Sequence, residues 1–298
     1  MRNVLIAAGA VLALAAGGCD AAMETKTDAA AAVDGVQFDQ ALHDKLPQAI
    51  RDRGTVRFVT DASYPPMEQF AADGRTIVGF EPDLADALGK VLGVKFEMVT
   101  GAFQTAIDKV AAGEYDGVMS AVTDTPEREK KADFVDYFSA GTSILVQKGN
   151  PRHVAELTNL CGQPVAIERG TVQADLLHRS QSICGGDPIK IDEYKTNADA
   201  LLQLRTGRAV AVLNDYPAAS FLASDSRTSN YYQLASPAQY EPGYIGIPFA
   251  KSNGQLRDAV KAALDKLIAA GAYDDLLQRW GLTSGAVKTA IVNGAKQD

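Results

Sequence analysis

The sequence lacks most of the residues and motifs from which enzymes build active sites. Its 298 residues include only three histidines, His43, His153 and His178, and a single tryptophan. It contains no GxSxG nucleophile elbow, no HExxH zinc motif, no phosphate-binding loop and no dinucleotide-binding glycine pattern. We therefore expect no cofactor and no metal, and we favour a protein that binds a molecule without transforming it.

Clustered positive charge is also lacking. The chain carries 29 Lys and Arg against 37 Asp and Glu, a formal net charge of -8. A nucleic-acid backbone requires a clustered basic face, and no run of Lys and Arg supplies one. We expect no nucleic acid among the partners.

The one long apolar stretch stands at the start of the chain. Arg2 precedes an apolar segment at residues 4–16, and small residues lead to Cys19. This pattern is typical of an export signal and is short for a membrane helix, which needs about 20 residues. We expect residues 1–19 to be a signal peptide, residues 20–37 to be a flexible tether, and the folded part to lie outside the cytoplasm.

Cysteine is rare, and the three cysteines have different settings. The sequence Ala16-Gly17-Gly18-Cys19 resembles a bacterial lipobox, which implies acylation of Cys19 and a lipid anchor; the usual Leu is replaced by Ala16. An ordinary cleaved leader is the alternative. Cys161 and Cys184 predict a disulfide in an exported protein. A metal site that includes His178 is the alternative there, but the spacing matches no zinc pattern.

Predicted strands and helices alternate along the rest of the chain. Residues 82–92 have helical apolar spacing, start at Pro82 and stop before Gly93, and residues 256–268 repeat such a pattern. Residues 38–53 predict a short helix broken at Pro47. The expected strands are residues 55–60, 95–100, 117–122, 143–147, 164–168 and 209–215. This order predicts an α/β fold with mostly parallel sheets and helices on both faces, in one or, more readily at this length, two domains.

Ligands of such sheets bind beyond the carboxyl ends of the strands. The residues that follow the expected strands are therefore candidates for a binding site: Asp61, Tyr64, Phe103, residues 120–128, residues 168–173 and Asp215.

Several segments in this order resemble the amino-acid-binding proteins of solute-binding family 3, which serve ATP-driven (ABC) importers. They include TDASYPPMEQF, AAGEYDGVMSAVTDTPEREKKADFVDYF, LCGQPVAIERGTVQADL and TGRAVAVLNDYPAA, and the resemblance spans about residues 55–282. It implies a type II periplasmic-binding fold with two lobes and two hinge crossovers. We expect lobe 1 at residues 55–140 plus 245–283, lobe 2 at 145–240, a tail at 284–298, and hinge positions at Gly141 and Gly243.

The resemblance also implies how the two charged groups of an amino acid are held. Arg128 matches the arginine that binds the α-carboxylate in a bidentate manner. Asp215 matches the carboxylate that receives the α-ammonium from the opposite lobe. The alternatives are a surface arginine paired with Glu127 or Asp124, and an aspartate that caps the next helix.

The remaining predicted site residues fall into three groups. Ser120, Ala121 and Thr123 match one side of the ligand cradle, and Gly170, Thr171 and Val172 match a turn that offers backbone N–H groups, although a hydroxyl residue is usual where Val172 stands. Tyr64 and Phe103 match aromatic walls, with burial in a core as the alternative. Asp61, Glu81 and Glu168 are expected beside the ligand side chain, with solvated surface charge as the alternative.

The sequence thus predicts a monomeric, extracytoplasmic receptor that closes two lobes on a free polar or basic amino acid and delivers it to the permease subunits of an ABC importer. We kept two alternatives. A periplasmic cyclohexadienyl or arogenate dehydratase on the same fold needs a proton donor, for which Glu168 or Glu81 is the candidate. A ligand-sensing module is the other.

Overall fold

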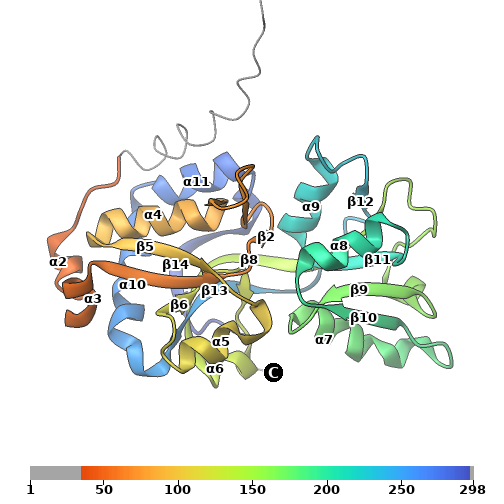
Figure 1. The fold of residues 1–298 in the computed structure, drawn as a ribbon, viewed down its shortest axis with the longest axis horizontal. Coiled ribbons are helices and arrows are strands. Elements are labelled where there is room, and N and C mark those ends of the chain that lie inside the picture. Colours follow the sequence, from red (N-terminus) through yellow and green to blue (C-terminus); the bar gives the residue numbers. More distant parts are fainter. Residues whose placement is uncertain (1–34, 296–298) are drawn as a thin grey trace, which may run out of the picture.

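Two sets of buried hydrophobic residues organise the chain. The computed structural model describes residues 35–295, so the predicted signal peptide, Cys19 and most of the predicted tether lie outside the described residues. One set draws its members from residues 46–138 and 245–290, and the other from residues 144–232. We call the parts around them the first lobe and the second lobe. Figure 1 shows the lobes side by side, with β8 running between them.

The first lobe is built on a parallel three-stranded sheet in the order β5–β1–β6 and a small antiparallel sheet in the order β2–β3–β4. Helix α4 is almost wholly buried, and α10 and α11 pack against it. The strands are β1 (Thr55–Thr60), β2 (Ser63–Tyr64), β3 (Glu68–Phe70), β4 (Ile77–Val78), β5 (Lys95–Thr100), β6 (Gly117–Val118) and β7 (Val122–Thr123). The helices are α2 (Gln40–His43), α3 (Gln48–Arg53), α4 (Phe80–Leu92), α5 (Phe103–Ala111), α6 (Pro126–Glu129), α10 (Gly254–Ala269) and α11 (Ala272–Trp280).

The second lobe has the parallel order β10–β9–β11, and β11 pairs with the long strand β8. Its strands are β9 (Pro164–Glu168), β10 (Lys190–Tyr194), β11 (Ala211–Asp215) and β12 (Tyr232–Leu234). Its helices are α7 (Val172–Arg179), α8 (Asn197–Arg205) and α9 (Tyr216–Ser224), with short 3-10 turns at Leu157–Leu160 and Ser180–Cys184. Cys161 and Cys184 form the predicted disulfide, which closes a loop around β9 and α7.

Two long strands, β8 (Ala132–Gln147) and β13 (Tyr240–Ala250), pass from one lobe to the other and pair antiparallel. The α/β class is confirmed, and the sheets are mixed because both crossing strands pair antiparallel with their neighbours. Gly141 lies at this crossing, but its φ is not positive, so the expected dihedral freedom is not used there. A Cβ at Gly141 would lie 2.9 Å from the Cβ of Gln239, and close approach of the two strands is the reason for glycine.

Three local expectations from the sequence require correction or refinement. The expected strand at residues 117–122 is split into β6 and β7, because Ala121 adopts a φ of 47° between them. Helix α4 begins two residues before Pro82, after Gly79, whose φ is 149° and whose position leaves no space for a Cβ beside the Met67 carbonyl. Residues 38–53 do form helices, α2 and α3, separated at Pro47.

The expected tail at residues 284–298 is wrong for its described part. Residues Ala286–Val292 form strand β14, which pairs antiparallel with β8. Val287 and Ala290 are buried, and Gly285 packs so closely on the Phe138 ring that a Cβ would overlap it. The first lobe therefore extends beyond residue 283.

Within residues 35–295, no helix is both long and apolar enough to cross a bilayer. The same part of the chain holds no group of three or more His, Cys, Asp or Glu side chains arranged to bind a metal ion.

Candidate functional site

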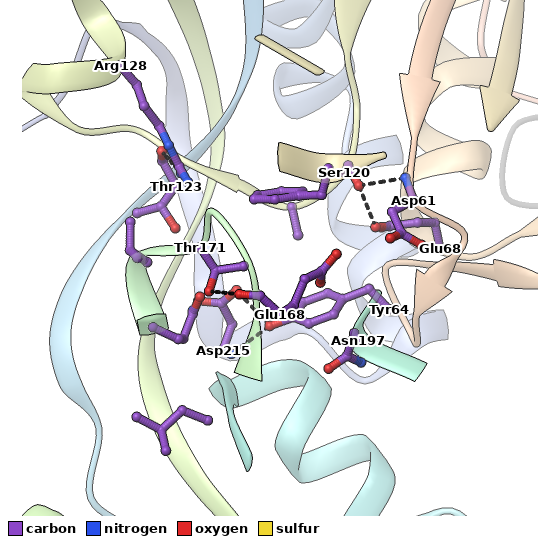
Figure 2. A pocket seen from close by; sticks show the side chains of 15 residues that line it. Asp61, Tyr64, Glu68, Ser120, Thr123, Arg128, Glu168, Thr171, Asn197 and Asp215 are labelled. Carbon is purple, nitrogen blue, oxygen red and sulfur yellow. Dashed lines mark hydrogen bonds between the residues drawn. The ribbon is translucent and has the colours of Figure 1, made fainter. Parts of the chain in front are cut away.

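A cavity lies between the lobes. The individually predicted site residues line it, except Glu81 and Gly170, and they come from the ends of strands and the starts of helices in both lobes. In Figure 2, Arg128 and Thr123 lie on one side of the cavity and Ser120, Asp61 and Glu68 on the other, with Glu168, Tyr64 and Asp215 between them. The lining combines one guanidinium with the four carboxyl groups of Asp61, Glu68, Glu168 and Asp215.

Arg128 links the two lobes through backbone carbonyls. It lies on α6, which begins after the N-cap Thr125. Its Nη1 donates to the Thr123 oxygen at 2.8 Å, and its Nη2 donates across the cleft to the Gly170 oxygen at 3.0 Å. The guanidinium also lies 5.6 Å from the centre of the Phe103 ring. Burial lowers the pKa of this guanidinium, but an arginine remains charged at physiological pH.

The surface pairing considered for Arg128 is not the one present. The Glu127 carboxylate forms an ion pair with Lys130, and Asp124 accepts a hydrogen bond from the backbone of Ala295. The guanidinium is thus held in the cleft by neutral carbonyl groups, and it remains able to bind an anion.

Asp215 is buried at the end of β11 and bonds to both lobes. Tyr64, from the first lobe, donates its hydroxyl hydrogen to Asp215 Oδ2 at 2.9 Å and accepts the Asp215 backbone N–H at 2.7 Å. Gln173 donates to Asp215 Oδ1 at 2.9 Å. The side chain makes no capping bond to α9, so the capping alternative does not apply. Burial raises the pKa of Asp215 from 3.8 to about 6, against the lowering effect of the Tyr64 hydrogen bond.

Tyr64 therefore contributes more than an aromatic wall. Its hydroxyl is one of the groups that join the lobes, and burial beside Asp215 raises its pKa well above 10. The hydroxyl consequently stays protonated and acts as a donor toward the carboxylate.

Ser120 and Ala121 are fixed by carboxyl groups of the first lobe. The Ser120 hydroxyl donates to Glu68 Oε1 at 3.0 Å and accepts the Asp61 backbone N–H at 3.0 Å. The Ala121 N–H donates to Glu81 Oε1 at 2.8 Å, and the Tyr137 hydroxyl donates to the same oxygen. These hydrogen bonds fix the backbone between β6 and β7, where Ser120 and Ala121 line the cavity.

Glu81 does not line the cavity, which corrects its predicted place beside the ligand. It lies in the first turn of α4, and its side chain is fully buried beneath Ala121. It has Glu68 as a buried neighbour, and burial raises the pKa of both groups. Its position makes it a support for the Ala121 backbone.

Asp61 and Glu168 form an acidic pair across the cleft. Asp61 follows β1 in the first lobe and Glu168 ends β9 in the second, and each carboxyl group affects the pKa of the other. Burial, strengthened by the Asp61 charge, raises the pKa of Glu168 from 4.5 to about 9. Burial also raises the pKa of Asp61. Glu168 is thus a buried neutral acid at pH 7, not a solvated surface charge.

The turn after β9 is shaped by Gly170 and Thr171. Gly170 has a φ of 80°, and Thr171 is the N-cap of α7. The Thr171 hydroxyl accepts the Ala174 N–H at 3.2 Å and donates to the Glu168 carbonyl at 2.8 Å. Val172, the first residue of α7, lines the cavity without a hydroxyl. A helix N-terminus in this position suits an anionic ligand group.

Four lining residues had no assigned role in the sequence analysis: Glu68, Gln173, Asn197 and Leu213. Gln173 ends a candidate range, and Leu213 lies two residues before Asp215, on the same face of β11. Asn197 reaches the Ser63 carbonyl across the cleft at 3.1 Å, and Ser120 donates to Glu68. No local pattern in the sequence marks Asn197 or Glu68, because the contact of Asn197 depends on how the lobes meet and that of Glu68 depends on packing within the first lobe.

The family model for bacterial extracellular solute-binding proteins, family 3, matches residues 56–283. The chain belongs to this family. The arginine-binding protein ArgT of Corynebacterium glutamicum is 30% identical over 255 residues, which cover 83% of this chain and 81% of that protein. The family match confirms the resemblance that the sequence segments indicate.

Solved structures of the same type agree with the fold. An ancestral arginine-binding protein bound to arginine is 30% identical, with a TM-score of 0.70 over 76% of this chain and 98% of its own. The ancestral amino-acid-binding protein AncCDT-1, described as a precursor of cyclohexadienyl dehydratase, is 32% identical, with a TM-score of 0.69 over 78% and 97% of the two chains. The two-lobed periplasmic-binding architecture is therefore confirmed.

The raised pKa of Glu168 predicts a pH effect on stability. The folded protein keeps this proton up to about pH 9, whereas the unfolded chain releases it near pH 4.5, so the contribution of Glu168 to stability falls as the pH rises between these values. A glutamine amide does not ionise in this pH range. We therefore expect the unfolding free energy of Glu168→Gln to fall less between pH 5 and pH 9 than that of the wild type. Urea unfolding at several pH values measures this loss.

The exposed carboxyl of Glu114 offers the control, as Glu114→Gln. An unfolding free energy that falls equally steeply in the wild type and in Glu168→Gln would contradict the neutral state of Glu168.

Proposed function

We propose that this protein is the substrate-binding component of an ABC importer and that it binds a free basic amino acid, with arginine preferred. The observation that carries the proposal is the distribution of charge along the cavity. Arg128 lies on one side and Asp61 on the other, with Asp215 and Glu168 between them. Arginine has the complementary order of carboxylate, ammonium and guanidinium.

Each ligand group has a candidate partner. The α-carboxylate is expected to accept from the Arg128 guanidinium and from backbone N–H groups of the turn at residues 170–172. The α-ammonium is expected to donate to Asp215, whose oxygens each have a second lone pair besides those bonded to Tyr64 and Gln173. The side-chain cation would lie beside Asp61 and Glu168, where its positive charge would balance the negative charge of these carboxyl groups.

Closure of the lobes would couple binding to delivery. Arg128 belongs to the first lobe and Asp215 to the second, so a ligand that contacts both favours the arrangement in which the lobes meet. The crossing of β8 and β13, at residues 139–143 and 239–244, is the proposed hinge. The permease subunits of the importer would then recognise the closed form of a monomeric receptor.

The relatives support this choice of ligand. The name of the Corynebacterium glutamicum relative refers to arginine, and the ancestral protein of similar fold was solved with arginine bound. Identity near 30% leaves the side-chain pocket free to differ, so the acidic pair is the more direct argument.

Replacement of Arg128 by alanine is expected to weaken arginine binding at least about 30-fold, because loss of a charge-assisted pair in a desolvated cleft costs about 2–5 kcal/mol. Calorimetric titration of ligand-stripped protein measures the dissociation constant. Arg152→Ala, at an exposed arginine of the second lobe, is the control. Affinity of Arg128→Ala within a few-fold of the wild type would disprove the role of Arg128.

The four carboxyl groups of the lining predict a preference for ligand charge. Arginine, lysine, ornithine and glutamine should displace a bound reporter at lower concentration than glutamate or aspartate, since another carboxylate would add to the repulsion within the lining. Competition titration compares these ligands directly. Better displacement by glutamate would refute the proposed side-chain pocket and leave the amino-acid receptor in place.

A dehydratase remains the second candidate, and one observation favours it. Glu168 is a protonated carboxyl that lines the cavity, which is what a general acid requires, and one similar structure is described as a dehydratase precursor. Glu81, the other proposed donor, lies outside the cavity. Product formed from arogenate or prephenate by the purified protein, and lost in Glu168→Gln, would establish the enzyme; binding without turnover supports the receptor.

A lipid on Cys19 is proposed as the anchor that keeps the receptor at the outer face of the membrane. Cys19→Ser should move the mature chain from the membrane fraction to the soluble fraction. Fractionation and the mass of the N-terminal peptide decide the question. A wild-type chain that is already soluble and carries no lipid mass would indicate an ordinary cleaved leader.

A further inference from the structure

The described chain continues past the end of the family match at residue 283 and folds back on the first-lobe part of β8. Strand β14 pairs with β8 at Phe138, Asp136 and Val135. The chain then turns at Asn293, whose φ is 52°, and runs along α6 as far as Ala295. We call residues 286–295 the strap.

The end of the strap contacts a residue before the start of α6, the helix that carries Arg128, and the last residue of that helix. The Ala295 N–H donates to Asp124 Oδ2 at 3.2 Å and to Glu129 Oε1 at 3.1 Å. Asp124 lies just before α6, and Glu129 is its last residue, next to Arg128. One backbone N–H therefore joins the two carboxylates that flank the Arg128 segment.

Two further residues fix this position. The Asn293 side chain accepts the Phe134 N–H at 2.7 Å and donates to Asp133 Oδ1 at 3.1 Å, so it extends the pairing with β8. The Gly294 N–H donates to Asp136 Oδ2 at 3.0 Å. A Cβ at Gly294 would lie 2.6 Å from that oxygen and 2.9 Å from the Tyr244 ring, so a larger residue would require the strap or these side chains to shift.

The same segment connects directly to the cavity. Asp124 donates its N–H to the Tyr244 carbonyl of β13 at 2.8 Å, and the preceding carbonyl, that of Thr123, accepts from Arg128 Nη1. Residues 123–129 are thus held by β13 on one side and by the strap on another. If the strap were displaced, Asp124 and Glu129 would lose a common donor.

We propose that the strap is a positioning element for ligand binding: through Ala295, Gly294 and Asn293 it holds the segment 124–129 so that the Arg128 guanidinium meets the ligand carboxylate. No strap residue lines the cavity. The inference rests on the proposed function for its effect on affinity, whereas its effect on α6 does not depend on any ligand.

The test uses Gly294→Ala in the full chain. The added methyl group should displace the end of the strap, and we expect the dissociation constant for arginine to rise about tenfold, which corresponds to about 1.4 kcal/mol. Agmatine has the guanidinium but no carboxylate, so its affinity should change less than twofold. Gly186→Ala, at a glycine with open space around it, is the matched control and should leave both affinities unchanged.

Hydrogen exchange in the ligand-free protein supplies the second readout. The amides of residues 128 and 129 should exchange faster in Gly294→Ala than in the wild type, with the rest of the first lobe unchanged. Asn293→Gly, which permits the positive φ and removes only the side-chain bonds, should give a smaller change in the same direction and covers the case in which Gly294→Ala folds poorly.

The outcomes separate the two proposals. Unchanged exchange of α6 in both variants, or equal weakening of arginine and agmatine, would overturn the positioning role of the strap. A wild type that binds no basic amino acid would overturn the proposed function, while faster exchange of α6 would still establish that the strap holds this helix.

Discussion

The antiparallel pairing of β8 with β13 is the constraint on which the other features depend. Both strands leave one core and enter the other, so the two passages of the chain lie next to each other. The ends of β1, β7, β9 and β11 are thereby brought to one cleft, although they come from different sheets or sheet positions. Register shifts in this ladder, between Tyr240 and Gly243 and again at Ile245, bend the strands at the place where the lobes part.

The chemistry of the cleft follows from an excess of buried acid. Neighbouring buried carboxyl groups, such as Asp61 with Glu168 and Glu68 with Glu81, raise one another's cost of ionisation, which a proton or a cation relieves. The pair between Asp61 and Glu168 is open to the cavity, and the pair between Glu68 and Glu81 supports the backbone of its wall. The first pair can therefore discriminate among ligands, whereas the second maintains the shape of the site.

Sequence patterns predicted most of this arrangement wherever a local rule applied. The spacing of apolar residues predicted α4 and α10. The expected export to an oxidising compartment predicted the disulfide between Cys161 and Cys184, and the positions at strand ends indicated Asp215 and Glu168. The direction of a side chain at a helix start obeys no such rule, which is why Glu81 was expected in the cavity and lies beneath it. Strand β14 was missed because the exposed and buried positions of Ala286–Val292 do not alternate regularly.

The disulfide makes the stability of the second lobe depend on oxidation. The bond between Cys161 and Cys184 encloses β9, the turn with Gly170 and Thr171, and all of α7, which together form much of the cleft wall in the second lobe. Such a bond forms only in an oxidising compartment and stabilises mainly by restricting the unfolded chain. A chain in which this bond has not yet formed is therefore less stable than the oxidised chain. The cleft wall of the second lobe reaches its full stability only after the bond has closed.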